Sequence, residues 1–336
     1  MRSHIHILFK TLSTIYLWLS VNMLLAQDAQ LSQFYASPIY TNPAFAGAER
    51  KIRIASATRT QYTALNNNYK TMAISIDGYS SKYNGGLALL ASYDLAGDGF
   101  LQTVSLAGVY SYNIPVSRKW SLNTALQGAV IQRTYDITKL RFGDQLNEFI
   151  GFTDVPSKDL ANLNIQGVMF PNFSFGTMAY NKYFYGGFAI HNLFEPNQTL
   201  FNTSNGSNEV PLSRRYSTNL GLNVFLNKTR YSENDKILSP NILIMSQLNF
   251  YQVNLGLYLK NKSFTIGTWL RQTSRNADAM IFLVGIKLPN FRIGYSYDVP
   301  VSKVVIGGSH EISMVILINN PKSRARRSTL LLCPDL

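Results

Sequence analysis

The stretch TMAISIDG, residues 71–78, alternates aliphatic side chains with small or polar ones. Successive side chains of an extended chain point to opposite sides, so this pattern puts all the aliphatic residues of the stretch on one face. The same alternation recurs in YSTNLGLNVFLN, residues 216–227, and in residues 251–260 and 291–298. A period of two that returns along the whole chain predicts an all-β fold.

The alternating segments are numerous enough to form one large sheet. An even number of antiparallel strands closes into a barrel whose two chain ends lie on the same side. We expect fourteen strands, near residues 52–61, 70–79, 84–93, 100–112, 119–133, 165–178, 183–191, 214–226, 239–248, 250–259, 263–271, 279–288, 290–298 and 309–319.

The connections between these segments alternate in length. The second, fourth, sixth, tenth and twelfth are short, whereas the longest, residues 135–164 and 192–213, are the fifth and seventh. Outer-membrane barrels have short periplasmic turns and longer outer loops. The eighth connection, residues 227–238, departs from this rule.

A soluble β-sandwich also alternates, so the pattern alone leaves that alternative open. Two further features favour the membrane. The polar face carries Asn, Ser, Thr and Gln, as expected for a lumen, and aromatic residues gather near strand ends, as in interfacial girdles. The sequence therefore predicts a transmembrane antiparallel outer-membrane β-barrel of about 14 strands over residues 51–319. The aromatic residues concerned are Tyr93, Phe100, Tyr110, Trp120, Tyr183, Phe184 and Tyr185.

Residues 1–26 predict export. Basic residues precede an apolar run that ends at Ala26, which is typical of a signal peptide. A membrane anchor is the alternative, but the run is shorter than the roughly 20 residues that span a bilayer. Without Arg2 and Lys10, 29 basic residues face 18 acidic ones, a net charge of +11. An exported chain does not meet the genome, so we expect lipid or an acidic protein, and no nucleic acid, as partners.

Residues 27–50 do not fit the strand pattern. QDAQLSQFYASPIYTNPAFAG contains two prolines, which exclude a continuous ladder or helix, and an aromatic series that needs burial. A polar lumen accepts irregular backbone, whereas lipid does not. We therefore expect this segment to plug the barrel just inside the periplasmic mouth, with the Asn42 side chain capping the turn that Pro43 imposes. The residues expected to form the plug or contact a partner are Gln33, Phe34, Tyr35, Tyr40, Asn42, Pro43, Phe45 and Gly47.

Residues that could perform chemistry are few. His191 and His310 occur without any nucleophile motif, and His310 and Glu311, as neighbours in a strand, should face opposite ways. Asp94, Asp98 and Asp144 lack the spacing of a calcium loop. We expect no catalytic, metal or cofactor site, and no enzyme. An outer-membrane hydrolase is the alternative to be tested.

The carboxy-terminal residues 320–336 form a basic tail that we expect in the periplasm. Its single cysteine could form an intermolecular disulfide, or it could be a thiol packed among the neighbouring leucines. The tail residues that we expect to contact a partner are Arg324, Arg326, Arg327, Cys333 and Pro334.

Several motifs resemble one family. Gln27-Asp28, Ser32-Gln33-Phe34-Tyr35 and Asn42-Pro43-Ala44-Phe45-Ala46-Gly47 are similar to the start of the mature PorP/SprF proteins. The resemblance continues at Tyr185-Gly186-Gly187-Phe188, Gly308-Ser309-His310-Glu311-Ile312 and Cys333-Pro334, although the chain ends in Asp335-Leu336 where the family has a basic residue and Phe.

The resemblance implies a non-enzymatic component of the type IX secretion and gliding machinery. It would lie in the outer membrane with both mature termini periplasmic. It would assist the secretion or surface attachment of a partner adhesin or other cargo with a matching carboxy-terminal signal, and contact periplasmic components of the secretion motor. The alternative is a transport channel, porin-like or for hydrophobic substrates, because fourteen strands can enclose a pore.

Overall fold

The computed structural model describes residues 30–49, 51–64, 69–97, 101–136, 143–147, 151–153, 155, 157, 167–199, 209–226, 236–274, 276–301 and 307–319. Regular structure in these ranges is almost entirely β-strand. The strands of the main sheet are β1 (Ile52–Gln61), β2 (Tyr69–Ser80), β3 (Gly85–Ala96), β4 (Leu101–Pro115), β5 (Ser121–Tyr135), β8 (Val168–Tyr180), β9 (Phe184–His191), β10 (Arg215–Leu222), β11 (Val224–Phe225), β12 (Ile237–Gln247), β13 (Phe250–Asn261), β14 (Phe264–Thr273), β15 (Ala277–Lys287), β16 (Phe291–Pro300) and β17 (Ser309–Ile318).

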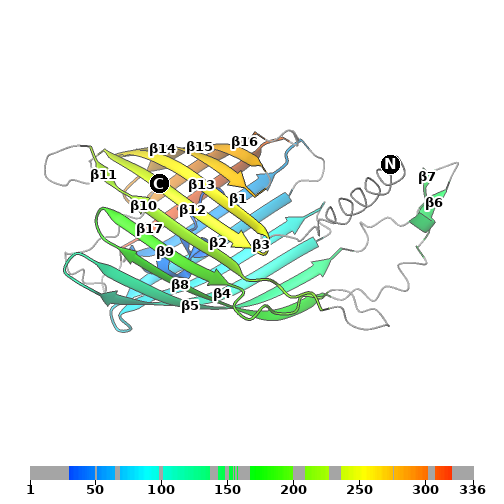
Figure 1. Ribbon diagram of the computed structural model, residues 1–336, viewed down its shortest axis with the longest axis horizontal. Helices are drawn as coiled ribbons and strands as arrows, with labels where there is room; N and C mark the ends of the chain where they lie inside the picture. The colour runs from blue at the N-terminus through cyan, green and yellow to red at the C-terminus, as the bar shows by residue number, and fades with distance from the viewer. Residues whose placement is uncertain are drawn as a thin grey trace, which may run out of the picture.

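These strands close into a barrel (Figure 1). Each pairs antiparallel with its neighbours along the chain, β1 pairs with β17, and β10 pairs with β12. Because β11 continues β10 beyond Asn223, the described part of the chain forms a closed ring of fourteen strands. The expected number is confirmed, and every expected segment overlaps one strand of the ring.

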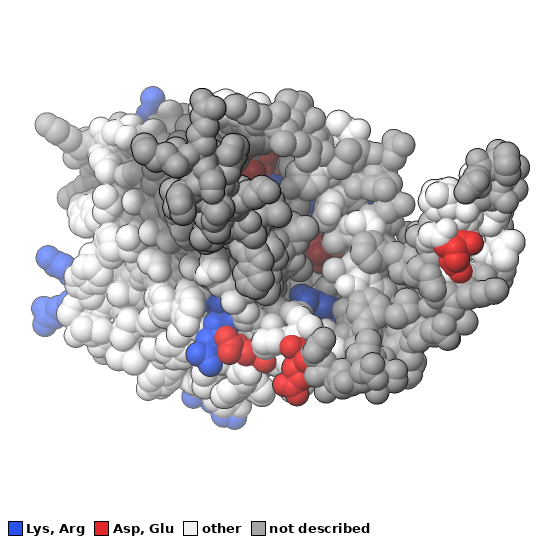
Figure 2. Space-filling model, turned by 45° about the vertical axis from the view of Figure 1, so that its right-hand side comes forward, with Lys and Arg blue, Asp and Glu red and all other residues white. Residues whose placement is uncertain are grey.

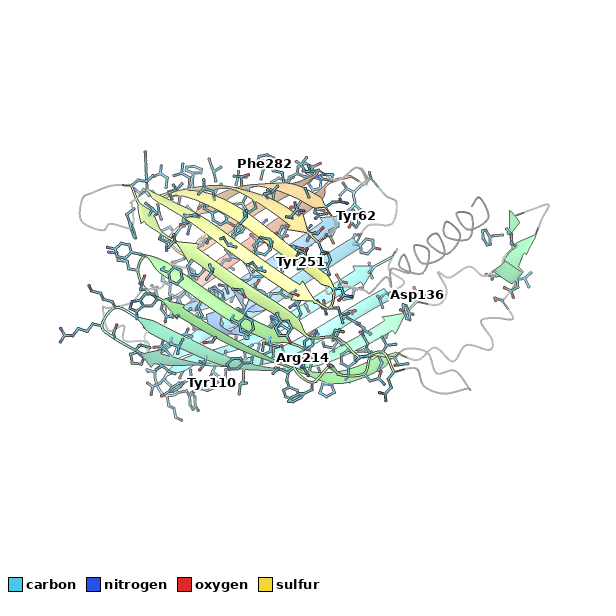
Figure 3. The ribbon with its side chains drawn as sticks, in the orientation of Figure 1. Tyr62, Tyr110, Asp136, Arg214, Tyr251 and Phe282 are labelled. Atoms are coloured by element: carbon cyan, nitrogen blue, oxygen red, sulfur yellow. The ribbon has the colours of Figure 1, made fainter. Side chains whose placement is uncertain are left out.

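Burial in the wall is the inverse of that in a soluble protein. In the middle of β2, Ile74 is 47% exposed, whereas its neighbour Ser75 is 3% exposed. Figure 3 shows the outward direction of Phe282 from β15. A soluble sandwich would bury the aliphatic face and hydrate the polar one, because apolar burial drives its folding. The wall is therefore built for lipid outside and polar contacts inside.

Aromatic residues near the strand ends follow the expected girdle with one exception. Tyr93, Tyr110, Trp120 and Tyr183 are between 38% and 50% exposed on the outer surface. Tyr185 is 5% exposed and points inward, so its assignment to the girdle was wrong. The parity of β9 explains this, since Tyr185 lies between the outward-facing Phe184 and Gly186 in a strand whose side chains alternate. Phe100 lies outside the described residues.

The two rims of the barrel differ. The short-turn rim carries residues 81–84, 116–120, 181–183, 262–263 and 288–290. The long-connection rim carries the described ends of the two longest connections, residues 136, 167, 192–199 and 209–214. The exceptional eighth connection joins β11 to β12 on the short-turn rim, and residues 227–235 of it lie outside the described chain. A small hairpin, β6 (Leu146–Asn147) with β7 (Gly151–Phe152), stands beyond the long-connection rim in Figure 1.

No helix in the described ranges is long and apolar enough to span a membrane.

Candidate functional site

Residues 30–49, the amino-terminal segment, form the candidate site. They contain a four-residue helical turn, α2 (Pro38–Thr41), and a 3₁₀ turn, η1 (Pro43–Phe45), each beginning with a proline. Proline suits the first position of a helix because the N–H that it lacks would have no partner there. The buried side chains of the segment pack against inward-facing residues of strands around the ring, from β1 to β17.

The early part of the segment is held by a carboxylate. The backbone N–H groups of Ser32 and Gln33 donate to the two oxygens of Glu311, at 2.6 Å and 2.9 Å. The Gln33 amide nitrogen donates to the Ser296 hydroxyl at 3.0 Å, and its oxygen accepts from Ser313 at 2.5 Å. Gln33 is completely buried. A predicted contact residue is thus bound to both β16 and β17.

Four charged side chains surround Ser32, and we call them the Asp298 cluster: Arg59, Arg271, Asp298 and Glu311. Arg59 and Arg271 lie 2.8 Å and 2.9 Å from the Asp298 carboxylate. The Ser32 hydroxyl donates to Asp298 at 2.7 Å and accepts hydrogen bonds from both guanidinium groups. Each guanidinium group thus lies within ion-pair distance of a carboxylate, which offsets the desolvation of buried ions.

The aromatic residues after Gln33 pack on β13 and β14. The Phe34 ring packs edge-on against Trp269, with 5.2 Å between the ring centroids. The Tyr35 ring packs edge-on against Tyr258, with 5.0 Å between the centroids. Such edge contacts stabilise aromatic pairs beyond the area that they bury. Burial raises the pKa of the Tyr35 phenol well above its usual value, and the neighbouring Tyr258 raises it further. Tyr35 is therefore neutral.

The helical turn α2 contacts β9 and β10. The carbonyl oxygen of Thr41 accepts a hydrogen bond from Ser217 at 2.9 Å and lies 3.0 Å from His191 Nε2. The Arg215 guanidinium lies 5.8 Å from the centroid of the Tyr40 ring, within the range of a cation–π contact. The side chain of His191 therefore contacts the backbone of the amino-terminal segment in this structure.

Asn42 joins the two turns to the wall. Its Oδ1 accepts a hydrogen bond from Ala44 N at 2.9 Å, which is the expected cap. Its Nδ2 lies 3.2 Å from the Thr177 carbonyl oxygen and 3.4 Å from the Asn219 side-chain oxygen. Asn42 is fully buried. One side chain thus uses both its acceptor and its donor.

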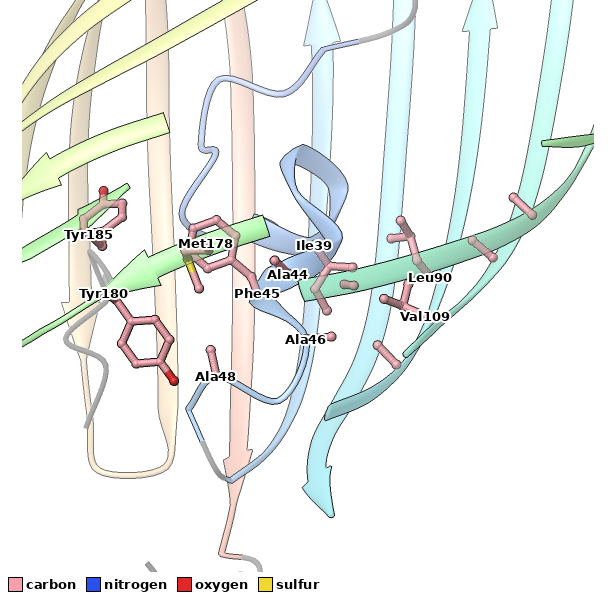
Figure 4. Close-up of a cluster of buried hydrophobic side chains, with 14 residues drawn as sticks. Ile39, Ala44, Phe45, Ala46, Ala48, Leu90, Val109, Met178, Tyr180 and Tyr185 are labelled. Atoms are coloured by element: carbon pink, nitrogen blue, oxygen red, sulfur yellow. The ribbon is translucent and has the colours of Figure 1, made fainter. Parts of the chain in front are cut away.

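The last part of the segment approaches the short-turn rim. Phe45 packs against Tyr185 and the inward face of β3 to β8, as Figure 4 shows. Gly47 has a φ of +68° and donates its N–H to Asp77 at 2.8 Å, and Asp77 pairs with Arg53 at 2.8 Å. Arg292 pairs with Glu49 at 3.0 Å. A second group of paired charges therefore holds this end.

The eight predicted residues of the segment are thus all on its contacts with the wall or in its turns. The expected position just inside the periplasmic mouth was wrong, because Ser32 bonds Asp298 near the long-connection end of β16, whereas Gly47 bonds Asp77 near the short-turn end of β2. Arg53 and Arg59 contact the two ends of the segment and are about 20 Å apart along β1, at about 3.4 Å per residue. The sequence did not identify the charged residues of the wall as contacts of the segment. They look only like exceptions to the small and neutral polar residues of the inner face. Their inward parity was the available signal, as in β1, where arginines alternate with outward Ile52 and Thr58. The predicted tail residues, Arg324, Arg326, Arg327, Cys333 and Pro334, lie outside the described chain.

The two mature histidines lie on opposite sides of the wall. His191 is 4% exposed inside, whereas His310 is exposed outside, with its Nδ1 2.7 Å from the Tyr295 hydroxyl. Glu311 is buried on the inner face, so His310 and Glu311 face opposite ways as expected. Within the described ranges, no three His, Cys, Asp or Glu side chains gather where they could hold a metal ion.

Comparison with solved structures finds outer-membrane barrels. The toluene transporter TbuX of Ralstonia pickettii is 12% identical, with a TM-score of 0.47, over 84% of this chain and 92% of that one. Omp33 of Acinetobacter baumannii is 7% identical, with a TM-score of 0.44, over 81% and 100%. A FadL homologue of Pseudomonas aeruginosa is 10% identical, with a TM-score of 0.45, over 84% and 94%.

Comparison of the sequence with curated proteins gives no match. The model of a family described as type IX secretion system membrane protein PorP/SprF matches residues 24–316, most of the chain and all of the barrel up to the last strand. The resemblance at the amino-terminal motif is thereby confirmed. The chain belongs to the PorP/SprF family of type IX secretion system membrane proteins.

Proposed function

We propose that this protein is a non-enzymatic, plugged barrel of the outer membrane that assists the secretion or surface attachment of a partner adhesin or other cargo. The observation that carries the proposal is the binding of the amino-terminal segment to the wall from Ser32 to Glu49. A barrel filled by its own chain is a scaffold on which other proteins assemble. The carboxy-terminal tail lies in the periplasm, and residues 1–26 are the export signal. The start of the amino-terminal segment lies at the opposite rim, because Ser32 bonds Arg59 and Asp298 near the long-connection ends of β1 and β16.

The contacts of the segment favour a closed lumen over an open pore through which solutes pass. Gln33 and Asn42 replace water with hydrogen bonds to the wall, and the intervening aromatic rings are packed edge-on. Each buried polar partner left unpaired by withdrawal would cost about 1–3 kcal/mol. Withdrawal of the segment therefore requires a partner that compensates for several lost contacts at once.

Conductance in a planar bilayer tests closure. We expect the intact protein to be silent and a variant without residues 27–47 to conduct ions steadily. Heat-modifiable mobility on a gel shows whether the deletion variant folds as a barrel. Steady conductance of the intact protein would favour the alternative, a porin-like channel or a transporter of hydrophobic substrates. A folded deletion variant that stays silent would contradict closure by this segment.

Partner identity is tested by crosslinking in native outer membranes followed by affinity capture and mass spectrometry. We expect a secreted surface protein or adhesin with a matching carboxy-terminal signal, together with periplasmic components of the secretion motor. Basic residues Arg324, Arg326 and Arg327 of the tail are the proposed periplasmic contacts. Capture of the machinery by a variant lacking residues 320–336, at the level of the full chain, would contradict that role.

A further inference from the structure

A trough runs across the outer wall of the barrel over strands β1 to β8. Its volume is about 1040 Å³. Its floor lies at Gly108 of β4 and Gly128 of β5, which are partners in register. A Cβ on Gly108 would meet no atom within 4 Å, so the backbone is open to the bilayer there. The trough is thus a hollow in a wall that otherwise presents large side chains.

The trough is on the lipid side and not in the lumen. Leu89 and Leu126, which line it, are 58% and 63% exposed. In the described part of the amino-terminal segment, no residue lines it, although that segment packs against Ala88 and Val109 on the inner face of the same strands. The sheet therefore separates the trough from the segment.

The trough is long and apolar. Its floor follows one row of paired residues across four strand spacings, from Ile76 on β2 through Leu89 and the two glycines to Phe173 on β8. At about 4.8 Å per strand this row is about 19 Å long. The row crosses the tilted strands and is therefore oblique to the membrane normal. An acyl chain that fills one leaflet is about 15 Å long, half of a hydrocarbon core about 30 Å thick, so a chain lying obliquely along the row would fit within it.

Basic residues lie near the side of the trough that faces the short-turn rim, although no lysine or arginine of the described chain lines it. Tyr110 lines it on the outer surface (Figure 3) and donates a hydrogen bond to the Tyr83 carbonyl oxygen at 2.9 Å. The Lys82 ammonium lies 5.3 Å from the centroid of the Tyr83 ring. Lys51 directly precedes Ile52, which also lines the trough. The nearby lining carboxylate, Asp77, is buried and paired with Arg53.

The charge of this rim is one-sided. The described turns at residues 81–84 and 116–120 contain Lys82, Arg118 and Lys119 and no acidic residue. In Figure 2, lysine and arginine side chains project at the left-hand edge, where no aspartate or glutamate is seen on this face. Cations beside interfacial tyrosines lie at the depth of lipid headgroups.

We propose that the trough binds an anionic phospholipid, with an acyl chain over Gly108 and Gly128 and the headgroup phosphate at Lys82. The apolar floor favours an acyl chain, and the nearby lysine favours a negatively charged headgroup. The occupant is a lipid and not a partner helix, because the trough opens on the outer, lipid-facing surface and the lysine near its short-turn side matches a phosphate. Such a lipid would join the wall to the periplasmic leaflet at a defined position.

Native mass spectrometry tests the site with phosphatidylglycerol as the probe. The full-length protein is reconstituted in phosphatidylcholine nanodiscs that contain a minor fraction of phosphatidylglycerol, and the lipid retained on the released barrel is counted. We expect one retained phosphatidylglycerol. We expect Gly108→Leu to abolish retention and Lys82→Gln to weaken it about five-fold, the contribution of one cation at a membrane surface.

Two variants are matched controls. Val284→Leu enlarges a side chain that is 55% exposed on the outer face of β15, and Lys262→Gln removes a lysine from a turn of the same rim. Both should retain lipid like the unmodified protein. Equal retention by Gly108→Leu, equal loss with Lys262→Gln, or equal retention of the two lipids would each overturn the proposal. If Gly108→Leu does not fold, Gly128→Leu narrows the same floor and is subject to the same outcomes.

Discussion

The carbonyl oxygen of Ala46 lies so close to the Cα of Gly86 that a Cβ at position 86 would collide with it. The Gly47 amide nitrogen would lie 2.7 Å from the same Cβ. Gly86 is the second residue of β3 and faces inward, so the wall has no side chain where the amino-terminal segment passes. Glycine is commonly found where another backbone approaches a strand closely. The wall and the segment therefore fit each other at this point.

A larger residue at position 86 should expel this part of the segment. We expect Gly86→Val to lower the free energy of unfolding by about 1–3 kcal/mol, as overpacking does. Urea titration of the protein in lipid vesicles measures this, and a planar bilayer measures the conductance that displacement should cause. Gly108→Val is the control, because its side chain would project into the open trough. Equal effects of the two substitutions would contradict a specific fit.

Asp298 balances two arginines, and its neutralisation should be costly. Asp298→Asn preserves shape but leaves Arg59 and Arg271 with reduced compensation inside the barrel. Breaking a buried ion pair costs about 3–5 kcal/mol, and we expect a loss near that range in the free energy of unfolding.

The control for Asp298 is an exposed pair. Glu195 and Arg214 are 3.8 Å apart, and their side chains are 41% and 47% exposed. Exposed pairs contribute about 0–1 kcal/mol, so Glu195→Gln should change little. A loss below 1 kcal/mol with Asp298→Asn would show that the Asp298 cluster does not depend on its charge balance.

The strands could be predicted because each carries its own signal. Residues 71–78 alternate, and the structure places the same aliphatic residues on the outside of β2. The Asp298 cluster could not be predicted in this way, because its members come from four strands. Arg59 and Glu311 become partners only when β1 pairs with β17, the step that closes the barrel. Register across such distant pairs is a property of the whole ring and of no local pattern.

The amino-terminal segment shows the same division. Local chemistry predicted its turns, since Asn42 and Pro43 determine a cap between neighbours in sequence. Its depth in the barrel was not predictable, because Ser32 and Gln33 have partners on β16 and β17 that are more than 260 residues away in sequence. The partners of Ser32 on β1 and β14 join them only once the ring has closed. Aromatic content indicated burial but did not indicate which strands would receive the rings.

Asn42 should hold the segment in place. Asn42→Ala removes the cap on Ala44 and the donors to Thr177 and Asn219. Each lost buried bond costs about 0.5–1.5 kcal/mol, so for three bonds we expect a loss of about 1.5–4.5 kcal/mol in the free energy of unfolding and faster proteolysis of the segment.

Asn181 provides a control for the lost cap. Its Oδ1 accepts 2.7 Å hydrogen bonds from the N–H groups of Tyr183 and Phe184 in a turn of the short-turn rim. Asn181→Ala should therefore destabilise the turn and leave cleavage of the segment unchanged. Proteolysis followed by mass spectrometry of the fragments distinguishes the two variants, and equal cleavage would contradict a specific role for Asn42.

The outward face of β2 should respond to charge according to depth in the bilayer. Ile74 lies in the middle of the strand and is 44–47% exposed together with Met72 and Ile76. An arginine at the midplane of a membrane barrel costs about 2–4 kcal/mol, and near an interface it costs about 0–1 kcal/mol. We expect the larger loss in the free energy of unfolding for Ile74→Arg. The smaller loss is expected for Val116→Arg, because Val116 lies in a turn of the short-turn rim and is 64% exposed.

Urea titration in vesicles measures both losses. The two side chains are similarly apolar and both exposed, so only the surrounding medium separates them. Equal losses would mean that the aliphatic face of β2 is not embedded in lipid.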